Sequence, residues 1–479
     1  MRGGLLSRLL SDEEGSAARR FILSGVFWLI IGSSVGVIVA IKMSDPHFLG
    51  GIPWLTFGRI RPIHTNGQLF GWLSMVQIGL ALYVLNRLTR VRLYSERLAN
   101  LVVWLWNLTV VLAVITLGLG MTQGREYAEL VWPLDILVLV CFGLLAYNIF
   151  MTVLRRQERQ IYVSLWYIMG SFVWMTLIYF IGNIVWVTPW NTAPGAPFGG
   201  ALAGVNDANI NWFYGHNVLG LWFTTMGVAS IYYLLPVTAR NPLYSHRLSL
   251  IGFWTIGMFY IWTGAHHLVW GPVPYWLQTV AIIFSVLLII PVSTVVVNFL
   301  GTMRGRWDLL IKSPAIRFYI TGTVFYLITC LQGPLQSLRS VSQVVKFTNW
   351  VPGHAHLALF GTFSFMAFGG VYYILPRLLG RRSMAYPALV EWQYWIALIG
   401  FFGFASSLWI GGLVQGLMWT AGTPFLEGMR AQAPYYLVRA VSGALMWVSV
   451  LLFAYNVYAT ALGQSEEVTA ARKAAPVAA

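Results

Sequence analysis

Long apolar segments, each sufficient to cross a lipid bilayer, recur along the whole 479-residue sequence. A membrane-spanning helix needs about 20 mostly apolar residues. The segments predict twelve helices, near residues 21–43, 61–86, 99–121, 131–154, 163–187, 210–236, 249–270, 276–301, 315–338, 351–376, 389–417 and 434–462. Only 9% of the residues are charged, against about 25% in an average soluble domain. We therefore expect an all-α, polytopic membrane protein, which excludes a cytosolic globular enzyme, a disordered chain and a nucleic-acid-binding module.

Membrane topology accounts for the net charge of +15. Cytoplasmic loops of membrane proteins carry an excess of Lys and Arg. If the first helix starts in the cytoplasm, 22 of the 30 basic residues fall on that side. They lie in the two terminal segments and in the loops near 87–97, 155–159, 240–247, 304–317 and 377–382. This alternation predicts one membrane domain over residues 1–479, with cytoplasmic tails at 1–20 and 465–479. The long connections 44–60, 188–209 and 418–433 then lie outside.

Histidine is the most informative residue type in this sequence. His47 and His246 fall in predicted loops, whereas the other six of the eight histidines lie in or at the ends of apolar helices. Ionisable residues are costly in a membrane and are usually functional there. Neutral imidazole is a common ligand of iron and copper. We therefore expect these six side chains to bind metal or haem.

His354 and His356 stand at the start of the tenth predicted helix. Two residues along an α-helix correspond to a rotation of about 200°, so their side chains should point to opposite sides. Such a pair is badly placed to bind one metal together and well placed to hold two cofactors, one on each flank. His64, at the outer end of the second helix, could pair with one of them across a haem plane.

A second group of histidines belongs to the sixth and seventh predicted helices. His266 and His267 are adjacent at the outer end of helix seven, and His216 lies near the outer end of helix six. Three imidazoles with an open coordination position suit copper or zinc. Tyr260 precedes His267 by seven residues, so a continuous helix would place it on nearly the same face, about 10 Å below. A phenol at that place could donate a proton and an electron.

The chain resembles the catalytic subunit of the haem–copper oxidase superfamily, and within it the C-type, or cbb-type, cytochrome c oxidase. The resemblance covers nearly all twelve predicted helices. It rests on ordered motifs, which are P-W-L-T-F-G-R-I-R-P-I-H-T-N (53–66), R-E-Y-A-E-L-V-W-P-L-D (125–135), Q-I-Y-V-S-L-W-Y (160–167), W-F-Y-G-H-N (212–217), Y-I-W-T-G-A-H-H-L (260–268) and G-H-A-H (353–356).

The resemblance implies a role for each of the six histidines. His64 and His356 would be the axial ligands of a low-spin haem b, and His354 the proximal ligand of a high-spin haem b. The ligands of the copper that faces this second haem would be His216, His266 and His267. Tyr260 matches the active-site tyrosine, which in this family is covalently joined to the first copper histidine. In A- and B-type relatives that tyrosine comes from helix six instead, where this chain reads G-H-N-V-L-G.

The implied activity is that of a terminal respiratory oxidase in a bacterial inner membrane. It would reduce dioxygen to water with electrons from cytochrome c and would be coupled to proton translocation. The electrons would arrive through membrane-bound c-type cytochrome subunits. This chain has no Cys-x-x-Cys-His sequence and so no covalently attached haem of its own. The resemblance further implies that Arg59 and Arg61 bind haem propionates and that Glu126 helps to bind a calcium ion.

The resemblance also implies a path for protons from the cytoplasmic side to the buried site. No Asp, Glu or Lys lies at mid-membrane in the sixth to tenth predicted helices, so the path would depend on hydroxyl groups and water. The family's path maps onto Ser249, Tyr260, Thr321 and Tyr326. One departure bears on it: the family usually has a glutamate in the ninth helix where this chain has Gln332. We therefore expect oxidase activity with altered proton coupling.

Two alternatives compete with this interpretation. A nitric oxide reductase of the same superfamily has the same six histidines, with a non-haem iron in place of copper. It keeps a glutamate four residues after the helix-six histidine, where this chain has Gly220, and it lacks the helix-seven tyrosine. A twelve-helix secondary transporter would fit the composition, but it gives no reason for six outer histidines. It also predicts internal repeats, which we do not find in the sequence.

Overall fold

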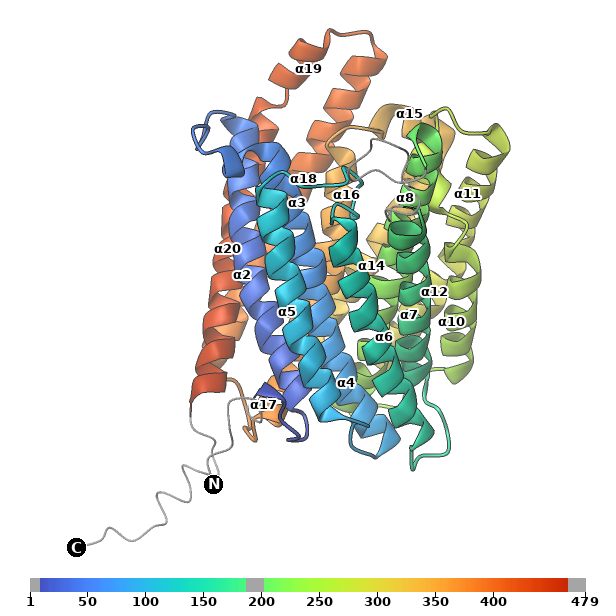
Figure 1. Ribbon diagram of the computed structural model, residues 1–479, viewed down its shortest axis with the longest axis vertical. Helices are drawn as coiled ribbons and strands as arrows, with labels where there is room; N and C mark the ends of the chain where they lie inside the picture. Colours follow the sequence, from blue (N-terminus) through green and yellow to red (C-terminus); the bar gives the residue numbers. More distant parts are fainter. Residues whose placement is uncertain (1–8, 187–201, 464–479) are drawn as a thin grey trace, which may run out of the picture.

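A computed structural model describes residues 9–186 and 202–463 of the chain. Every regular element within those ranges is helical, and the long helices run side by side as a bundle (Figure 1). The predicted all-α membrane fold is confirmed. The membrane-length segments are Ser16–Ser44 (α2), Phe57–Thr89 (α3–η2–α4), Glu96–Gly118 (α5), Trp132–Leu154 (α6), Val163–Val185 (α7–η3), Gly204–Ala239 (α8–η5–α9), Tyr275–Thr302 (α11–α12), Pro314–Ser337 (α14), Trp350–Leu378 (α16–η7–α17), Pro387–Thr420 (α18) and Phe425–Leu462 (α19–α20).

These eleven segments are long and apolar enough to cross a membrane. They match eleven of the twelve predicted helices, with ends that differ by six residues or fewer except for the last span, which begins at Phe425 rather than at 434. The remaining predicted helix is the seventh, which corresponds to α10. This helix runs from His246 to Tyr260 and has only 15 residues. The N-terminal tail is shorter than predicted, because α2 begins at Ser16 rather than after residue 20. The C-terminal tail 465–479 and most of the connection 188–209 lie outside the described residues.

The seventh predicted helix is not continuous, which corrects the expectation for residues 249–270. Its α-helix ends at Tyr260, and a separate 3₁₀ segment follows from Gly264 to Leu268 (η6). The backbone therefore turns between the tyrosine and the histidine pair, so the helical-face argument that related Tyr260 to His267 was wrong. The break lets two adjacent histidines reach one point, because neighbours on a regular helix diverge by about 100°.

Three helices form the centre of the bundle, and each carries predicted ligands. In their most apolar stretches, 94% of the residues of Phe57–Thr89 are buried, 89% of Gly204–Ala239 and 83% of Trp350–Leu378, against at most half in every other span. Each contains a π-helical segment soon after its histidines: η2 (Gly67–Ser74), η5 (Leu219–Thr224) and η7 (Leu357–Ser364). Such wide turns occur frequently at functional sites.

The same side-chain clamp occurs three times at one end of the bundle. Asn148 of α6 accepts from the amide of Ser95 at 3.1 Å and donates to its carbonyl at 2.8 Å. Asn298 of α12 holds Ser245 in the same way, and Asn456 of α20 holds Tyr386. Each asparagine is followed four residues later by a threonine, whose hydroxyl accepts from the backbone amide of the residue just before the clamped one. These threonines are Thr152, Thr302 and Thr460. The chain thus has an internal threefold repeat, which we did not find in the sequence.

Candidate metal centre

One internal cavity of about 670 Å³ brings all six predicted histidines together. It lies between the three central helices and also touches α2, α14, α18 and α20. Neither His47 nor His246 lines it; His47 lies in a turn as expected, whereas His246 is the first residue of α10 rather than a loop residue. The cavity is large enough for bulky cofactors, and its wall is mostly apolar. The histidines that line it are His64, His216, His266, His267, His354 and His356.

His216, His266 and His267 form a cluster that fits a single metal ion. One ring nitrogen from each lies within 4.8 Å of the others. Nδ1 of His216 is 3.2 Å from Nε2 of His266 and 3.0 Å from Nε2 of His267. A neutral imidazole has only one N–H, so its Nδ1 can donate to at most one of these neighbours. A shared cation would satisfy all three nitrogens at once.

Neighbouring side chains fix two members of this cluster. The Nδ1 atom of His266 lies 2.5 Å from the hydroxyl of Ser285 on α11, which leaves Nε2 to face the cluster. The ring of Trp212 stacks on His267, with centroids 3.9 Å apart and planes 5° from parallel. A metal-binding histidine is usually oriented through its second nitrogen, and Ser285 supplies that contact here. Neither Ser285 nor Trp212 was predicted from the sequence.

His64 and His356 face each other as a pair of axial ligands would. Their ring centroids are 6.3 Å apart and their planes differ by 16°. Two metal–nitrogen bonds of about 2.0 Å, with about 1.1 Å from each nitrogen to its ring centre, span a similar distance. Each Nδ1 is bound to backbone, His64 to the Gly32 carbonyl at 2.8 Å and His356 to the Pro352 carbonyl at 2.7 Å. Both Nε2 atoms are therefore left free to bind iron.

His354 lies apart from that pair, toward the three-histidine cluster. Its Nδ1 is 3.3 Å from the side-chain oxygen of Gln332 on α14. An amide oxygen accepts from an N–H, so this contact favours the tautomer in which Nε2 is free. His354 and His356 therefore meet different neighbours although they are two residues apart, as expected from the rotation of a helix. Gln332 contacts a candidate haem ligand directly, so a change of this side chain would alter the hydrogen bonding of His354.

The ring of Tyr260 fills the space directly over the α-carbon of Gly220. The phenol ring stacks on His216, with centroids 4.7 Å apart and planes 17° from parallel. A Cβ atom built on Gly220 would overlap the ring carbons of Tyr260. The buried Nε2 of His216 has no hydrogen-bond partner within the described residues. Any side chain at position 220 would therefore displace the tyrosine from the cluster.

The rim of the cavity is charged, and not all of its charges were predicted. Arg61 and Glu126 both line it and form an ion pair at 2.5 Å. Arg59 instead donates to the Gly118 carbonyl at 3.1 Å and does not line the cavity. Sequence reasoning missed Arg439 of α20, a buried arginine that lies over the Phe404 ring and lines the cavity. An arginine within an apolar helix was the signal available for it.

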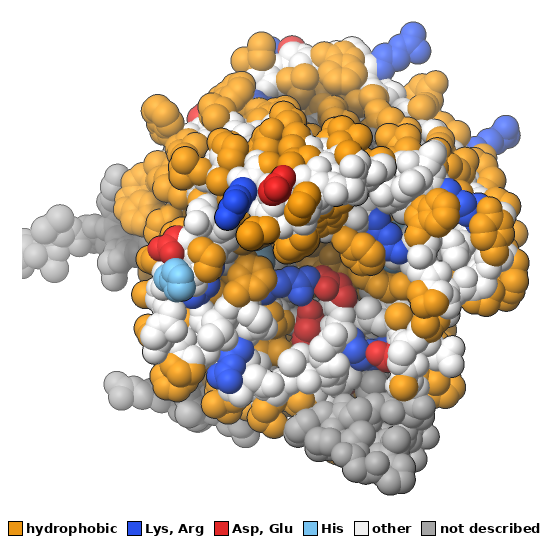
Figure 2. All heavy atoms as spheres, turned by 90° about the horizontal axis from the view of Figure 1, so that it is seen from above, with side chains coloured by type: hydrophobic (Ala, Val, Ile, Leu, Met, Phe, Trp, Pro, Cys, Tyr) orange, Lys and Arg blue, Asp and Glu red, His pale blue; other side chains and the backbone are white. Residues whose placement is uncertain are grey.

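The loop that carries Glu126 also holds a buried acid, Glu129. Its carboxylate accepts from the side chain of Asn66 at 3.1 Å. Burial, together with the nearby charge of Glu126, raises its pKa to about 7. Figure 2 looks onto this end of the molecule and shows acidic and basic side chains gathered around a central hollow. Charge at this face is therefore concentrated where the cavity meets the surface.

The predicted proton-path residues lie in three different settings. Tyr326 lines the cavity together with Tyr260. The hydroxyl of Ser249 is buried and donates to the His246 carbonyl of its own helix at 2.7 Å. The hydroxyl of Thr321 is 2.8 Å from that of Tyr394 on α18. Neither Ser249 nor Thr321 lines the cavity, so the structure brings together only the inner part of the predicted path.

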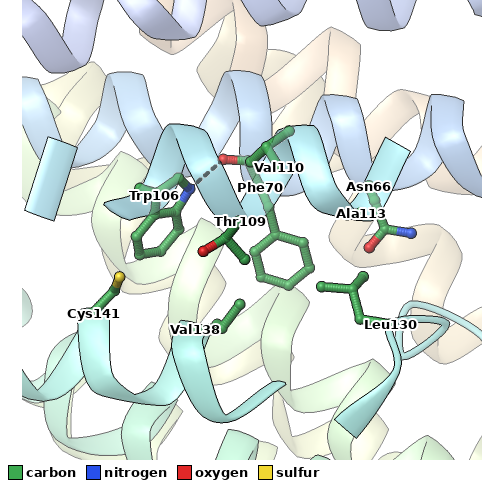
Figure 3. A pocket seen from close by; sticks show the side chains of 9 residues that line it. All are labelled: Asn66, Phe70, Trp106, Thr109, Val110, Ala113, Leu130, Val138 and Cys141. Atoms are coloured by element: carbon green, nitrogen blue, oxygen red, sulfur yellow. Dashed lines mark hydrogen bonds between the residues drawn. The ribbon is translucent and has the colours of Figure 1, made fainter. Parts of the chain in front are cut away.

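A second pocket near the same end does not have the chemistry of a metal site. Figure 3 shows it between α5 and α6, with Trp106 donating to the Phe70 carbonyl at 2.8 Å. Its volume is only about 10 Å³. The nine lining residues are mostly apolar, and Cys141 is its one thiol. The histidine cavity is therefore the better candidate for the functional site.

Within the described residues, a helical bundle with eleven membrane-length spans places two opposed histidines beside a separate three-histidine cluster, as expected of a haem–copper protein. The family model described as "Cytochrome C and Quinol oxidase polypeptide I" matches residues 16–445. The chain belongs to this family.

Individual relatives agree with that assignment. The chain is 33% identical over 449 residues to the "Cbb3-type cytochrome c oxidase subunit CcoN1" of Stutzerimonas stutzeri, which covers 92% of this chain and 94% of that protein. It is 34% identical to a "Cytochrome c oxidase subunit 1 homolog" of Agrobacterium tumefaciens, over 95% of this chain and 85% of that protein. A solved heme-copper terminal oxidase dimer matches the fold with a TM-score of 0.77 at 16% identity, over 94% of this chain and 86% of that one.

A nitric oxide reductase is a more distant relative. The chain is 25% identical to a nitric oxide reductase polypeptide of Stutzerimonas stutzeri, over 93% of this chain and 95% of that protein. The packing of Tyr260 against Gly220 gives a physical reason for the difference, because the glutamate expected in a reductase would have to occupy the volume of the tyrosine ring. The reductase alternative is therefore not favoured.

Proposed function

We propose that this chain is the catalytic subunit of a cytochrome c oxidase, a terminal enzyme that reduces dioxygen to water. The observation that carries the proposal is the division of six histidines in one cavity into an opposed pair, a single ligand and a cluster of three. A transporter needs no such arrangement. Oxygen chemistry is favoured over nitric oxide chemistry because Tyr260 lies beside the cluster and Gly220 leaves it room.

We propose two haems b and one copper as the cofactors, which the donor set supports. His64 and His356 would hold the low-spin haem, and His354 the high-spin haem. The ligands of the copper would be His216, His266 and His267. Bound there, haem iron and copper supply the redox chemistry that reduces oxygen. Arg61 is placed to bind propionates by charge-assisted hydrogen bonds, and Glu126 is placed to share a calcium ion with them.

The protein's own side chains then do three things. Backbone carbonyls hold His64 and His356, and Ser285 holds His266, in the tautomer that presents a free nitrogen. Tyr260 carries a phenol proton and an electron at the cluster, and the unpartnered Nε2 of His216 is available for the covalent link expected in this family. His354 and His356 lie on one turn of α16, so an electron needs to cross little more than a backbone between the two haems.

Protons and electrons would enter from opposite ends. The chain would lie in a bacterial inner membrane with both termini in the cytoplasm. The distribution of Lys and Arg supports this orientation, because the end of the bundle that is rich in basic residues would then face the cytoplasm. Protons would reach Tyr260 by way of Ser249, Thr321 and Tyr326 with the help of water, since Ser249 and Thr321 do not touch the cavity themselves. Electrons from cytochrome c would arrive at the outer end through c-type cytochrome subunits of the same complex.

Oxygen consumption by the purified complex tests this function. With reduced cytochrome c as donor, the Tyr260→Phe variant should lose more than nine-tenths of its turnover and keep its haem spectrum. Tyr147→Phe is the control, because Tyr147 lies on the surface of α6. Turnover in the Tyr260→Phe variant equal to that of the unchanged protein would contradict the proposed role of the tyrosine.

A further inference from the structure

A second large cavity opens at the end of the bundle opposite the histidine cavity. It has a volume of about 540 Å³ and lies where α2 begins and where α4 (Met75–Thr89) and α17 (Phe365–Leu378) end. Small-molecule sites usually measure about 300 to 1,000 Å³, so this cavity has the size of a ligand site. Its charged lining residues are Glu14, Arg87, Arg90, Arg92, Glu96 and Arg377.

Most of those charges, including both of the acids, are already satisfied within the chain. Arg92 pairs with Glu14 at 3.4 Å, and Arg90 pairs with Glu158 at 3.2 Å. Glu96 accepts from the amides of Gly15 and Ala17 at 2.8 and 3.1 Å. Its carboxylate thus caps the start of α2, where the first amides of a helix favour an anion. Glu96 is therefore engaged by the start of α2, and it forms no ion pair with an arginine among the described residues.

Arg87 and Arg377 differ from the other charged residues of this cavity in their pairing. Among the described residues, neither forms an ion pair with a carboxylate. Each guanidinium lies over a tyrosine ring of its own helix, Arg377 at 3.5 Å from the Tyr373 centroid and Arg87 at 5.2 Å from that of Tyr83. Arg377 also donates to the Tyr373 carbonyl at 2.5 Å. Two cations thus line one cavity, and no carboxylate among the described residues is in direct contact with either of them.

We propose that this cavity binds a phosphate-bearing ligand of nucleotide size, with Arg87 and Arg377 as the phosphate-binding residues. Guanidinium groups match phosphate oxygens with two parallel hydrogen bonds. Leu82, Val91, Leu93 and Leu378 supply an apolar wall for the rest of the ligand.

The phosphate could belong to a soluble ligand or to a lipid headgroup. Arg87 and Arg377 stand at the ends of two of the three central helices, which are the most buried spans of the bundle. Anionic lipids also bind basic pockets at the cytoplasmic side of membrane proteins, and both arginine side chains are exposed here. The phosphate chemistry is common to both sources, so the experiment must separate them.

Titration calorimetry of the purified complex in a neutral detergent tests the soluble source. ATP should bind with one site per chain, and inorganic pyrophosphate should compete with it. The double variant Arg87→Gln/Arg377→Gln should bind ATP at least tenfold more weakly, since a hydrogen bond to a charged group contributes roughly a tenfold to hundredfold factor. The matched control is Arg155→Gln, because Arg155 lies over the Tyr94 ring at the same end but does not line the cavity.

Native mass spectrometry of the same samples tests the lipid source. An anionic phospholipid retained by the unchanged protein and by Arg155→Gln, but lost from the double variant, would support the phosphate site with a lipid as its occupant. Equal ATP affinity in the double variant would overturn the proposal. So would the absence of both saturable phosphate binding and a retained anionic lipid. An unchanged unfolding temperature in the double variant shows that any loss of binding is local.

Discussion

At the scale of single residues, the contact between Tyr260 and Gly220 separates two chemistries. Both residues are adjacent to the three-histidine cluster, and only one side chain fits the volume that they share. The sequence predicted both residues as markers of the oxygen-reducing branch. It could not predict that the Tyr260 ring fills the space over Gly220, because the two residues are 40 positions apart and belong to different helices.

Substitution of Gly220 by alanine should therefore damage the site without unfolding the chain. A methyl group there overlaps the phenol ring, and overpacking of a buried position typically costs about 1–3 kcal/mol. We expect oxygen turnover to fall more than tenfold while the haem spectrum is kept.

Gly143→Ala on α6 is the matched control for this prediction. A Cβ atom at Gly143 meets no atom within 4 Å, and alanine is the better helix former. Turnover should be unchanged in this variant. Full activity in Gly220→Ala would contradict the account of the shared volume.

Gln332 is the residue through which this chain departs from its family. Its oxygen contacts Nδ1 of His354, where the family resemblance leads us to expect a carboxylate. An amide cannot take up a proton, whereas a carboxylate would titrate and would make the histidine a stronger ligand. We expect Gln332→Glu to change the number of protons ejected per electron by reconstituted vesicles. Identical ratios in the two proteins would contradict altered proton coupling.

Glu129 should make stability depend on pH in a predictable direction. Its pKa rises from 4.5 in the unfolded chain to about 7 in the folded one, so the folded state binds the proton more tightly. Between those two values stability should fall as the pH rises, by about 3 kcal/mol in total. Unfolding temperatures measured from pH 4.5 to 7.5 should drop in the unchanged protein and stay flatter in Glu129→Gln.

A control acid distinguishes this effect from general charge effects. Glu158→Gln removes a partly exposed acid of the basic end, paired only with an exposed arginine. Its pH profile should follow that of the unchanged protein. A Glu129→Gln profile as steep as that of the unchanged protein would show that another group is responsible.

At the scale of helices, the sequence predicted positions well and irregularities badly. Apolar length alone placed eleven spans, with every end but one within six residues. The break between Tyr260 and Gly264 and the π-helical segments were not predicted. These departures depend on contacts between distant helices, such as His216 with His267, which the periodicity of one segment does not contain. The threefold clamp was missed for a related reason, since it needs only one Asn and one Thr per repeat.

The clamp predicts a stability cost that should recur in each repeat. Asn298→Ala removes two hydrogen bonds to the backbone of Ser245, at 2.9 and 2.8 Å. A buried group left without its partner costs about 1–3 kcal/mol. We expect Asn148→Ala, Asn298→Ala and Asn456→Ala to lower the unfolding temperature by similar amounts. Thr255→Ala, which removes only bonds from the hydroxyl to carbonyls of its own helix turn, should have little effect.

At the scale of the whole molecule, the two ends of the bundle differ in their residues. The six histidines line a cavity toward one end, and most charged residues of the second cavity lie at the other. The count of Lys and Arg remains a prediction of which loops share a side, and the six histidines predicted from the sequence lie in one cavity. The cavities themselves were not predictable, because their walls combine residues from many helices. Arg439 and Arg377 show this limit: each is one arginine in a linear sequence, and its role depends on what the fold places beside it.

The central claim is that one cavity holds two haems and one copper, bound by six histidines. Quantitative metal and haem analysis of the purified complex tests it most directly, after subtraction of the haem c carried by partner subunits. The account predicts two haems b and one copper for each copy of this chain, with the copper lost in His266→Ala. Iron in place of copper at the three-histidine cluster, or a chain without metal, would contradict it.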